Sequence, residues 1–78
     1  MKIEILGTGC AKCDKLEEMV KIAVQESGIN ADIKHIKDMK KIMAYGVLAT
    51  PAMVIDGQVK TSGKIPSLEE IKKLIYGL

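Results

Sequence analysis

The spacing of hydrophobic residues changes several times along the chain and so separates its predicted elements. Residues 2–6 predict a short strand rich in Ile and Leu, and residues 7–9 are expected to end it in a tight, exposed turn. From Ala11 onwards the apolar residues recur at i, i+3, i+4, i+7 and i+8, which is the spacing of one helix face. The pattern therefore predicts an amphipathic helix that stops at Gly28.

The middle of the chain repeats this order on a smaller scale. Residues 31–36 alternate again and predict a second strand at a sheet edge, parallel to the first because a helix connects them. Asp38 is a suitable N-cap for a short helix that runs to Ala44 and ends at Gly46.

The last third of the chain predicts a hairpin followed by a helix. The dipeptide at 56–57 is Asp-Gly, a strong two-residue turn signal between strands at 52–55 and 58–61. Ser67 and Glu70 have the spacing of a capping box and open a final helix. The element order is therefore βαβαββα, an α/β arrangement in a single domain spanning residues 1–78.

Composition adds that the core is aliphatic. The 78 residues include five Met and two Tyr but no Trp or Phe, so methionines are expected to help fill the interior. Met39, Met43 and Met53 are accordingly interpreted as core residues rather than metal ligands.

Charge argues against several classes of partner. The net charge is +2, and the lysines are spread among glutamates, which disfavours a dedicated nucleic-acid surface. No uninterrupted apolar run approaches the roughly 18 residues of a membrane span, and the first residues lack the pattern of a secretory signal. We expect a cytoplasmic monomer that contacts neither membrane nor nucleic acid.

The chemistry of the chain is concentrated in its two cysteines. Cys10 and Cys13 are separated by two residues and lie between the first strand and the first helix. Such a pair can close into a small disulfide ring or bind a soft metal ion. In the cytoplasm a catalytic or metal-binding use is more common than a structural disulfide.

Three stretches together resemble a known family. They are Leu-Gly-Thr-Gly-Cys-Ala-Lys-Cys at 6–13, Gly-Val-Leu-Ala-Thr-Pro-Ala-Met-Val-Ile-Asp-Gly at 46–57, and Ser-Gly-Lys-Ile-Pro-Ser at 62–67. With the element order, they resemble the small thioredoxin-like or glutaredoxin-like proteins called small redox-active disulfide proteins. The resemblance implies a minimal thioredoxin fold: a four-stranded mixed sheet in the order second, first, third, fourth strand, with helices on both faces. It also implies a cis bond between Thr50 and Pro51.

The same resemblance implies a thiol–disulfide oxidoreductase linked to electron transport and cell redox homeostasis. From the residues themselves we expect Cys10 to be the attacking thiolate, because it would be the more exposed sulfur at the helix N-terminus, and Cys13 to be the resolving thiol. Lys12 would modulate the thiol pKa by its charge, although a lysine that only adds solubility remains the alternative. Glu4 lies six residues before Cys10, where thioredoxins carry a buried acid. A merely polar strand residue is the favoured interpretation of Glu4, and an exposed structural residue that of His35.

Two rival functions remain open at this stage. Small copper carriers also place C-x-x-C after a first strand, but their order is βαββαβ, and this chain has only two Cys and one His. A non-catalytic adaptor that binds peptides beside Pro51 is the other rival. The favoured function exchanges disulfides with proteins and is served by an unidentified upstream reductase, with no cofactor and no metal. Glutathione use is disfavoured because the chain has no Arg to bind its carboxylates.

Overall fold

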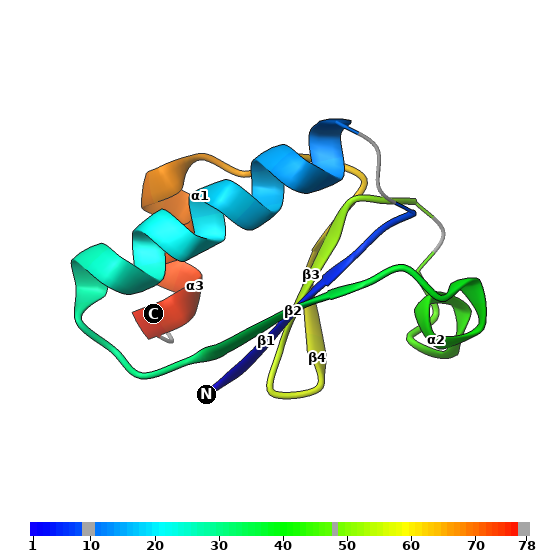
Figure 1. The fold of residues 1–78 in the computed structure, drawn as a ribbon, viewed down its shortest axis with the longest axis horizontal. Helices are drawn as coiled ribbons and strands as arrows, with labels where there is room; N and C mark the ends of the chain where they lie inside the picture. Colours follow the sequence, from blue (N-terminus) through cyan, green and yellow to red (C-terminus); the bar gives the residue numbers. More distant parts are fainter. Residues whose placement is uncertain (9–10, 48, 77–78) are drawn as a thin grey trace.

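The computed structural model describes residues 1–8, 11–47 and 49–76, and it has the predicted element order (Figure 1). The elements are β1 (Lys2–Leu6), α1 (Ala11–Ser27), β2 (Asp32–Ile36), α2 (Met39–Ala44), β3 (Ala52–Ile55), β4 (Gln58–Ser62) and α3 (Leu68–Tyr76). The predicted boundaries differ by one residue at the start of β2 and at the end of β4.

The four strands form one mixed sheet in the order β2-β1-β3-β4. β1 is central, parallel to β2 and antiparallel to β3, and β3 pairs antiparallel with β4. The predicted sheet order and the edge position of β2 are both confirmed. Because β1 and β3 run in opposite directions, the last residue of β1 lies beside the first residue of β3 at the same end of the sheet. There Leu6 is paired with Ala52.

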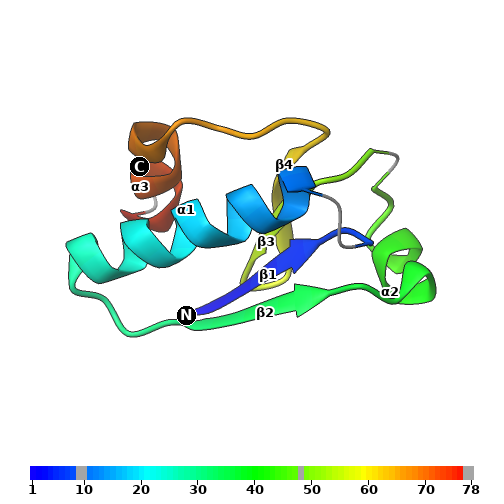
Figure 2. The same cartoon turned by 45° about the horizontal axis from the view of Figure 1, so that its top comes forward.

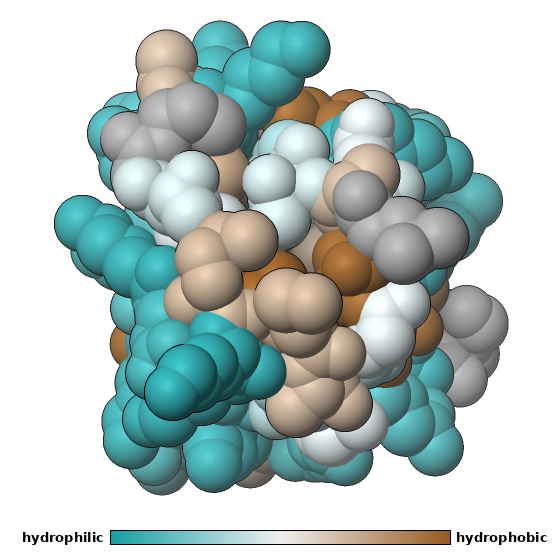
Figure 3. Space-filling view, turned by 90° about the vertical axis from the view of Figure 1, so that its right-hand side faces the viewer, coloured by the Kyte–Doolittle hydropathy of each residue, from teal (hydrophilic) through white to brown (hydrophobic). Residues whose placement is uncertain are grey.

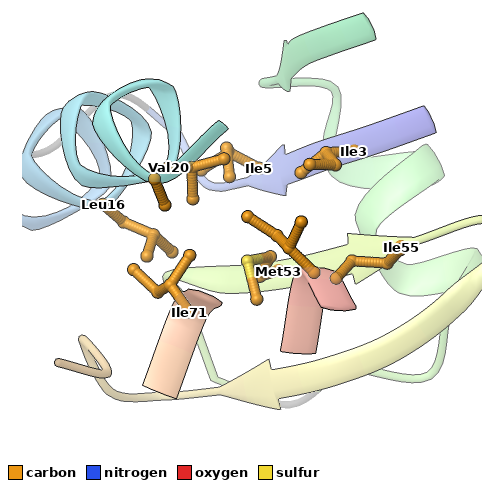
Figure 4. Close-up of a cluster of buried hydrophobic side chains, with 9 residues drawn as sticks. Ile3, Ile5, Leu16, Val20, Met53, Ile55 and Ile71 are labelled. Atoms are coloured by element: carbon orange, nitrogen blue, oxygen red, sulfur yellow. The ribbon is translucent and has the colours of Figure 1, made fainter. Parts of the chain in front are cut away.

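The main core lies between the sheet and the two longer helices. Figures 1 and 2 show α1 and α3 on the same side of the sheet. Figure 4 shows isoleucines of β1 and β3 and Met53 pointing towards side chains of α1 and α3. The buried residues of this cluster are Ile3, Ile5, Leu16, Val20, Ala23, Met53, Ile55, Ile71 and Ile75.

The opposite face of the sheet carries a smaller core under α2. Ile42 is the buried residue of this six-residue helix and packs with Leu6, Ala52 and Val54. Met39 and Met43 are 52% and 68% exposed, so the expectation that they are core residues is wrong, whereas Met53 is fully buried. Successive helical residues are rotated by about 100°. With Ile42 facing the sheet, Met39 and Met43 therefore lie on the flank of α2.

Local signals in the sequence explain where the elements begin and end. The Asp38 carboxylate accepts a hydrogen bond from the backbone N of Lys40, and Ser67 Oγ accepts one from the backbone N of Glu70. Each cap satisfies a backbone donor that the first helical turn leaves unpaired.

Among the described residues no helix is long and apolar enough to cross a membrane.

Candidate active site

The candidate active site begins where β1 runs into the loop before α1. Cys10 lies outside the described residues, but Cys13 lies in the first turn of α1 and is completely buried. A Cβ added at Gly7 would lie 2.1 Å from Cys13 Sγ and 3.1 Å from Cys13 Cβ. The Gly7 backbone therefore packs directly against the sulfur of Cys13. Any residue with a Cβ at position 7 would force Cys13 or the backbone to move.

Gly7 itself is held by the neighbouring strand. Its backbone N donates a 3.0 Å hydrogen bond to the carbonyl of Ile36, the last residue of β2. Gly7 is buried, so the expectation of an exposed turn is wrong at this position, while Thr8 is exposed as expected. The hydrogen bond continues the β1–β2 pairing one residue past the strand and draws the turn onto the end of the sheet.

The Thr50–Pro51 segment also lies close to Gly7. Its peptide bond is cis, the isomer that the resemblance implied, and the same added Cβ at Gly7 would lie 3.9 Å from Thr50 Cβ. Pro51 is buried and Thr50 is exposed. The Pro51 carbonyl accepts a 2.9 Å hydrogen bond from Gly63 N, which fixes this segment to the end of β4. The fold thus brings Cys13, Gly7 and Thr50 together from three separate parts of the chain.

Lys12 and Glu4 differ sharply in their surroundings. Lys12 is exposed on the first turn of α1. Glu4 is only 7% exposed, so its interpretation as a merely polar strand residue is wrong. It is buried on the α2 side of the sheet, and Tyr45 Oη donates a 2.6 Å hydrogen bond to its carboxylate. The objection that carboxylates are rarely buried unpaired does not apply, because Tyr45 supplies the partner.

His35 is also less isolated than its position in the sequence indicated. Its Nδ1 lies 2.7 Å from Glu17 Oε1, and Lys21 Nζ lies 3.0 Å from Glu17 Oε2. The hydrogen bond from Lys21 holds the pKa of the Glu17 carboxyl below its usual range, partial burial opposes this, and the contact with His35 acts in the same direction as Lys21. The expectation of an exposed histidine is therefore wrong, because α1 folds over β2 and covers it.

In the described ranges no three His, Cys, Asp or Glu residues are grouped so that they could hold a metal ion.

Comparison with known proteins identifies the family. The model of a thioredoxin domain matches residues 1–76. The chain is 47% identical over 75 residues to a thioredoxin of Methanothermobacter thermautotrophicus, covering 96% of this chain and 97% of that protein. The chain belongs to the thioredoxin family. A thioredoxin of Methanocaldococcus jannaschii is 46% identical over 71 residues, covering 91% and 81% respectively.

As a member of the thioredoxin family, the protein is a protein-disulfide oxidoreductase with a minimal thioredoxin fold. The sequence predicted this fold and activity. It did not point to Gly7 as the residue that covers Cys13, or to Tyr45 as the partner of Glu4. For Gly7, the available signal was a glycine immediately after a strand and six residues before Cys13. For Tyr45, no local pattern marks its contact with Glu4, because the two residues are 41 positions apart.

The Glu4–Tyr45 pair leads to a testable prediction. The hydrogen bond to Glu4 raises the pKa of Tyr45, and burial adds to the rise, because ionisation would place a phenolate beside a carboxylate. A raised pKa means that the pair stabilises the fold below pH about 10, where tyrosine ionises in the unfolded chain, and that this contribution is lost as the pH rises through the folded-state pKa.

We expect Glu4→Gln to lower the pKa of Tyr45, because it removes the charge and keeps an acceptor. In a Tyr76→Phe background Tyr45 is the one remaining tyrosine, so its ionisation can be followed alone by ultraviolet absorbance during an alkaline titration. Tyr76 is 54% exposed, so its replacement should leave the fold intact. An unchanged midpoint after Glu4→Gln would show that the carboxylate does not control Tyr45.

Proposed function

We propose that this protein exchanges disulfides with other proteins through a redox couple formed by Cys10 and Cys13. Cys10 is the nucleophile and Cys13 the resolving thiol. The observation that carries the assignment is the complete burial of Cys13 under the Gly7 backbone. A sulfur covered in this way cannot approach a disulfide on another protein, so its role is restricted to attack within the chain.

The proposed reaction has two steps. The Cys10 thiolate attacks one sulfur of the substrate disulfide, whose S–S bond breaks, and a mixed disulfide forms as one substrate thiolate leaves. The Cys13 thiolate then attacks the Cys10 sulfur and releases the second substrate thiolate, which takes up a proton as the first one does. The substrate gains two electrons and two protons, and the protein retains a Cys10–Cys13 disulfide.

Two opposing effects act on a thiolate at Cys13. The residue lies in the first turn of α1, where unpaired backbone amides and the helix dipole stabilise negative charge, whereas its complete burial favours the neutral thiol. Lys12 adds a positive charge beside it on the exposed side of the turn. Asp14, in the same turn, opposes this effect with a negative charge. We therefore assign Lys12 a modulating role and not an essential one.

The remaining modulating residues border the couple. Thr50 is exposed next to Gly7, so we propose that it and Pro51 contact the substrate beside the attacked disulfide. We propose that Glu4 influences proton transfer as a buried carboxylate held by Tyr45.

Thioredoxins act on proteins that contain disulfides, and we propose such proteins as the substrates here, with a separate reductase to regenerate the dithiol. We propose that the protein acts in the cytoplasm, because a dithiol couple that serves as a reductant needs a compartment that keeps thiols reduced. We also propose that it acts as a monomer.

A redox titration tests the proposed function. The purified protein would be equilibrated in dithiothreitol and glutathione buffers of defined potential, and the intramolecular disulfide measured by mass spectrometry after acid quenching. We expect a reversible two-electron transition roughly within −270 to −200 mV, the range of thioredoxins and glutaredoxins. A Cys13→Ser variant is the control and should show no such transition. Absence of the disulfide in the native protein, with stoichiometric binding of Cu(I) to the thiols, would instead support a metal carrier.

A further inference from the structure

The positive charge of the chain is unevenly distributed. Residues 37–45, which contain α2, carry three lysines and one aspartate, and the rest of the chain carries nine lysines and nine acidic residues. The whole net charge of +2 is therefore located in this segment. Lys37, Lys40 and Lys41 are all exposed. The carboxylate of Asp38 is already engaged as the cap of α2, through the backbone N of Lys40 at 2.9 Å.

The lysines surround an apolar surface. Met39 and Met43 are among the most exposed large hydrophobic side chains of the described residues, at 52% and 68%. Tyr45 and Val47, both half-buried, follow α2 in the chain and pack against the same small core. Figure 3 looks onto the α2 end of the molecule and shows apolar side chains gathered in the middle of this face, with hydrophilic ones around them. We call the surface of Met39, Met43 and the three lysines the α2 face.

The α2 face adjoins the active site at both of its ends. The residue before Lys37 is Ile36, whose carbonyl accepts the hydrogen bond from Gly7 N at 3.0 Å. On the other side, the chain runs from Val47 to Thr50, whose Cβ lies close to Gly7. A polypeptide bound beside Gly7 and Thr50 can therefore reach the α2 face directly.

We propose that the α2 face docks the protein partner of the exchange reaction through an acidic surface with an apolar centre. The proposal rests on the proposed function and specifies the substrate class. Exposed methionines suit such a surface because their flexible, polarisable side chains adapt to different apolar partners. The lysines attract carboxylates and accelerate encounter. Nucleic acid fits less well, because the centre of the face is apolar and no Arg is present to bind phosphate in two places.

Two synthetic peptides would serve as probes. Each contains one disulfide and the same leucines, but one carries Asp and Glu around the disulfide and the other carries Lys at those positions. We expect the native protein to reduce the acidic peptide with a kcat/KM about tenfold higher at low salt, and the advantage to shrink as salt screens the charges. The double variant Lys40→Glu/Lys41→Glu should abolish or reverse the preference.

The matched control changes charge equally but elsewhere. Lys60→Glu/Lys73→Glu alters two exposed lysines on β4 and α3 and should keep the native preference. Met39→Gln/Met43→Gln should raise KM for both peptides without altering the charge preference. Reaction of each variant with the small neutral 2-hydroxyethyl disulfide should be unchanged, which separates docking from thiol reactivity.

Several results would overturn the proposal. Equal kcat/KM for the two peptides would do so, as would an equal loss of preference in the two lysine variants. Competition by poly(U) RNA, lost in Lys40→Glu/Lys41→Glu while the peptides are reduced equally, would assign the face to nucleic acid instead. Failure of the proposed function would look different, because the native protein would then reduce neither peptide nor the small disulfide.

Discussion

A Cys13→Ser variant is expected to accumulate a mixed disulfide with a protein substrate such as insulin, while its multiple-turnover activity falls about 10³-fold or more. Cys10 can still attack the substrate, but the buried thiol that would release it is gone. Serine replaces the thiol with a hydroxyl of similar shape that is not nucleophilic near neutral pH, so the fully buried position should remain filled. Non-reducing electrophoresis and mass spectrometry would detect the covalent complex.

The matched variant is Cys10→Ser. It removes the proposed nucleophile and leaves the buried sulfur, so it should lose activity to the same extent and form no mixed disulfide. A complex trapped by Cys10→Ser in place of Cys13→Ser would reverse the assignment of the two roles. Equal trapping by both variants would show that the burial of Cys13 does not restrict its access to substrate.

Gly7→Ala is expected to destabilise the fold by about 1–3 kcal/mol and to reduce activity strongly, because the new methyl group and Cys13 Sγ would need the same space. The added Cβ would lie 2.1 Å from Sγ and 3.1 Å from Cβ, so the cysteine must rotate or α1 must move. Either movement displaces the resolving sulfur. Urea unfolding would measure the loss of stability, and the insulin assay the loss of activity.

A double-mutant cycle with Cys13→Ala makes this prediction specific. Cys13→Ala removes Sγ and leaves a small cavity, and the methyl group introduced by Gly7→Ala would occupy much of that cavity. We therefore expect Gly7→Ala to cost much less stability in the Cys13→Ala background than in the native protein. The same cost in both backgrounds would mean that Gly7 is required for its backbone conformation and not for its contact with the sulfur.

The elements of this protein follow from short-range patterns, and these are visible in the sequence. The helical spacing before Gly28, the Asp38 and Ser67 caps and the turn at 56–57 each act within a few residues. Their energetic effects are local, so the order βαβαββα could be predicted. The spacing of the two cysteines relative to the first helix also indicated the candidate site, because two thiols so placed can form a disulfide or bind a soft metal ion.

The predicted burial of a residue was wrong where it depends on how closely another helix or strand packs over that residue. Met39 and Met43 have helical spacing, but a six-residue helix buries one stripe, and Ile42 occupies it. His35 and Glu17 come together because α1 folds over the edge strand, and 18 residues separate them in the chain. A periodic pattern shows which residues share a face, but it does not show how much of that face another element covers.

The sequence by itself therefore determined the element order and the position of the two cysteines, since these depend on residue type and on spacing along the chain. Its resemblance to a known family implied the thioredoxin fold. Only the tertiary structure decided which residues lie around Cys13 and Glu4. It placed the Gly7 backbone over Cys13, gave the buried Glu4 a partner in Tyr45, and left the lysines and methionines of α2 exposed beside the site. These are contacts and exposures between segments far apart in sequence, and they exist only once the sheet has assembled.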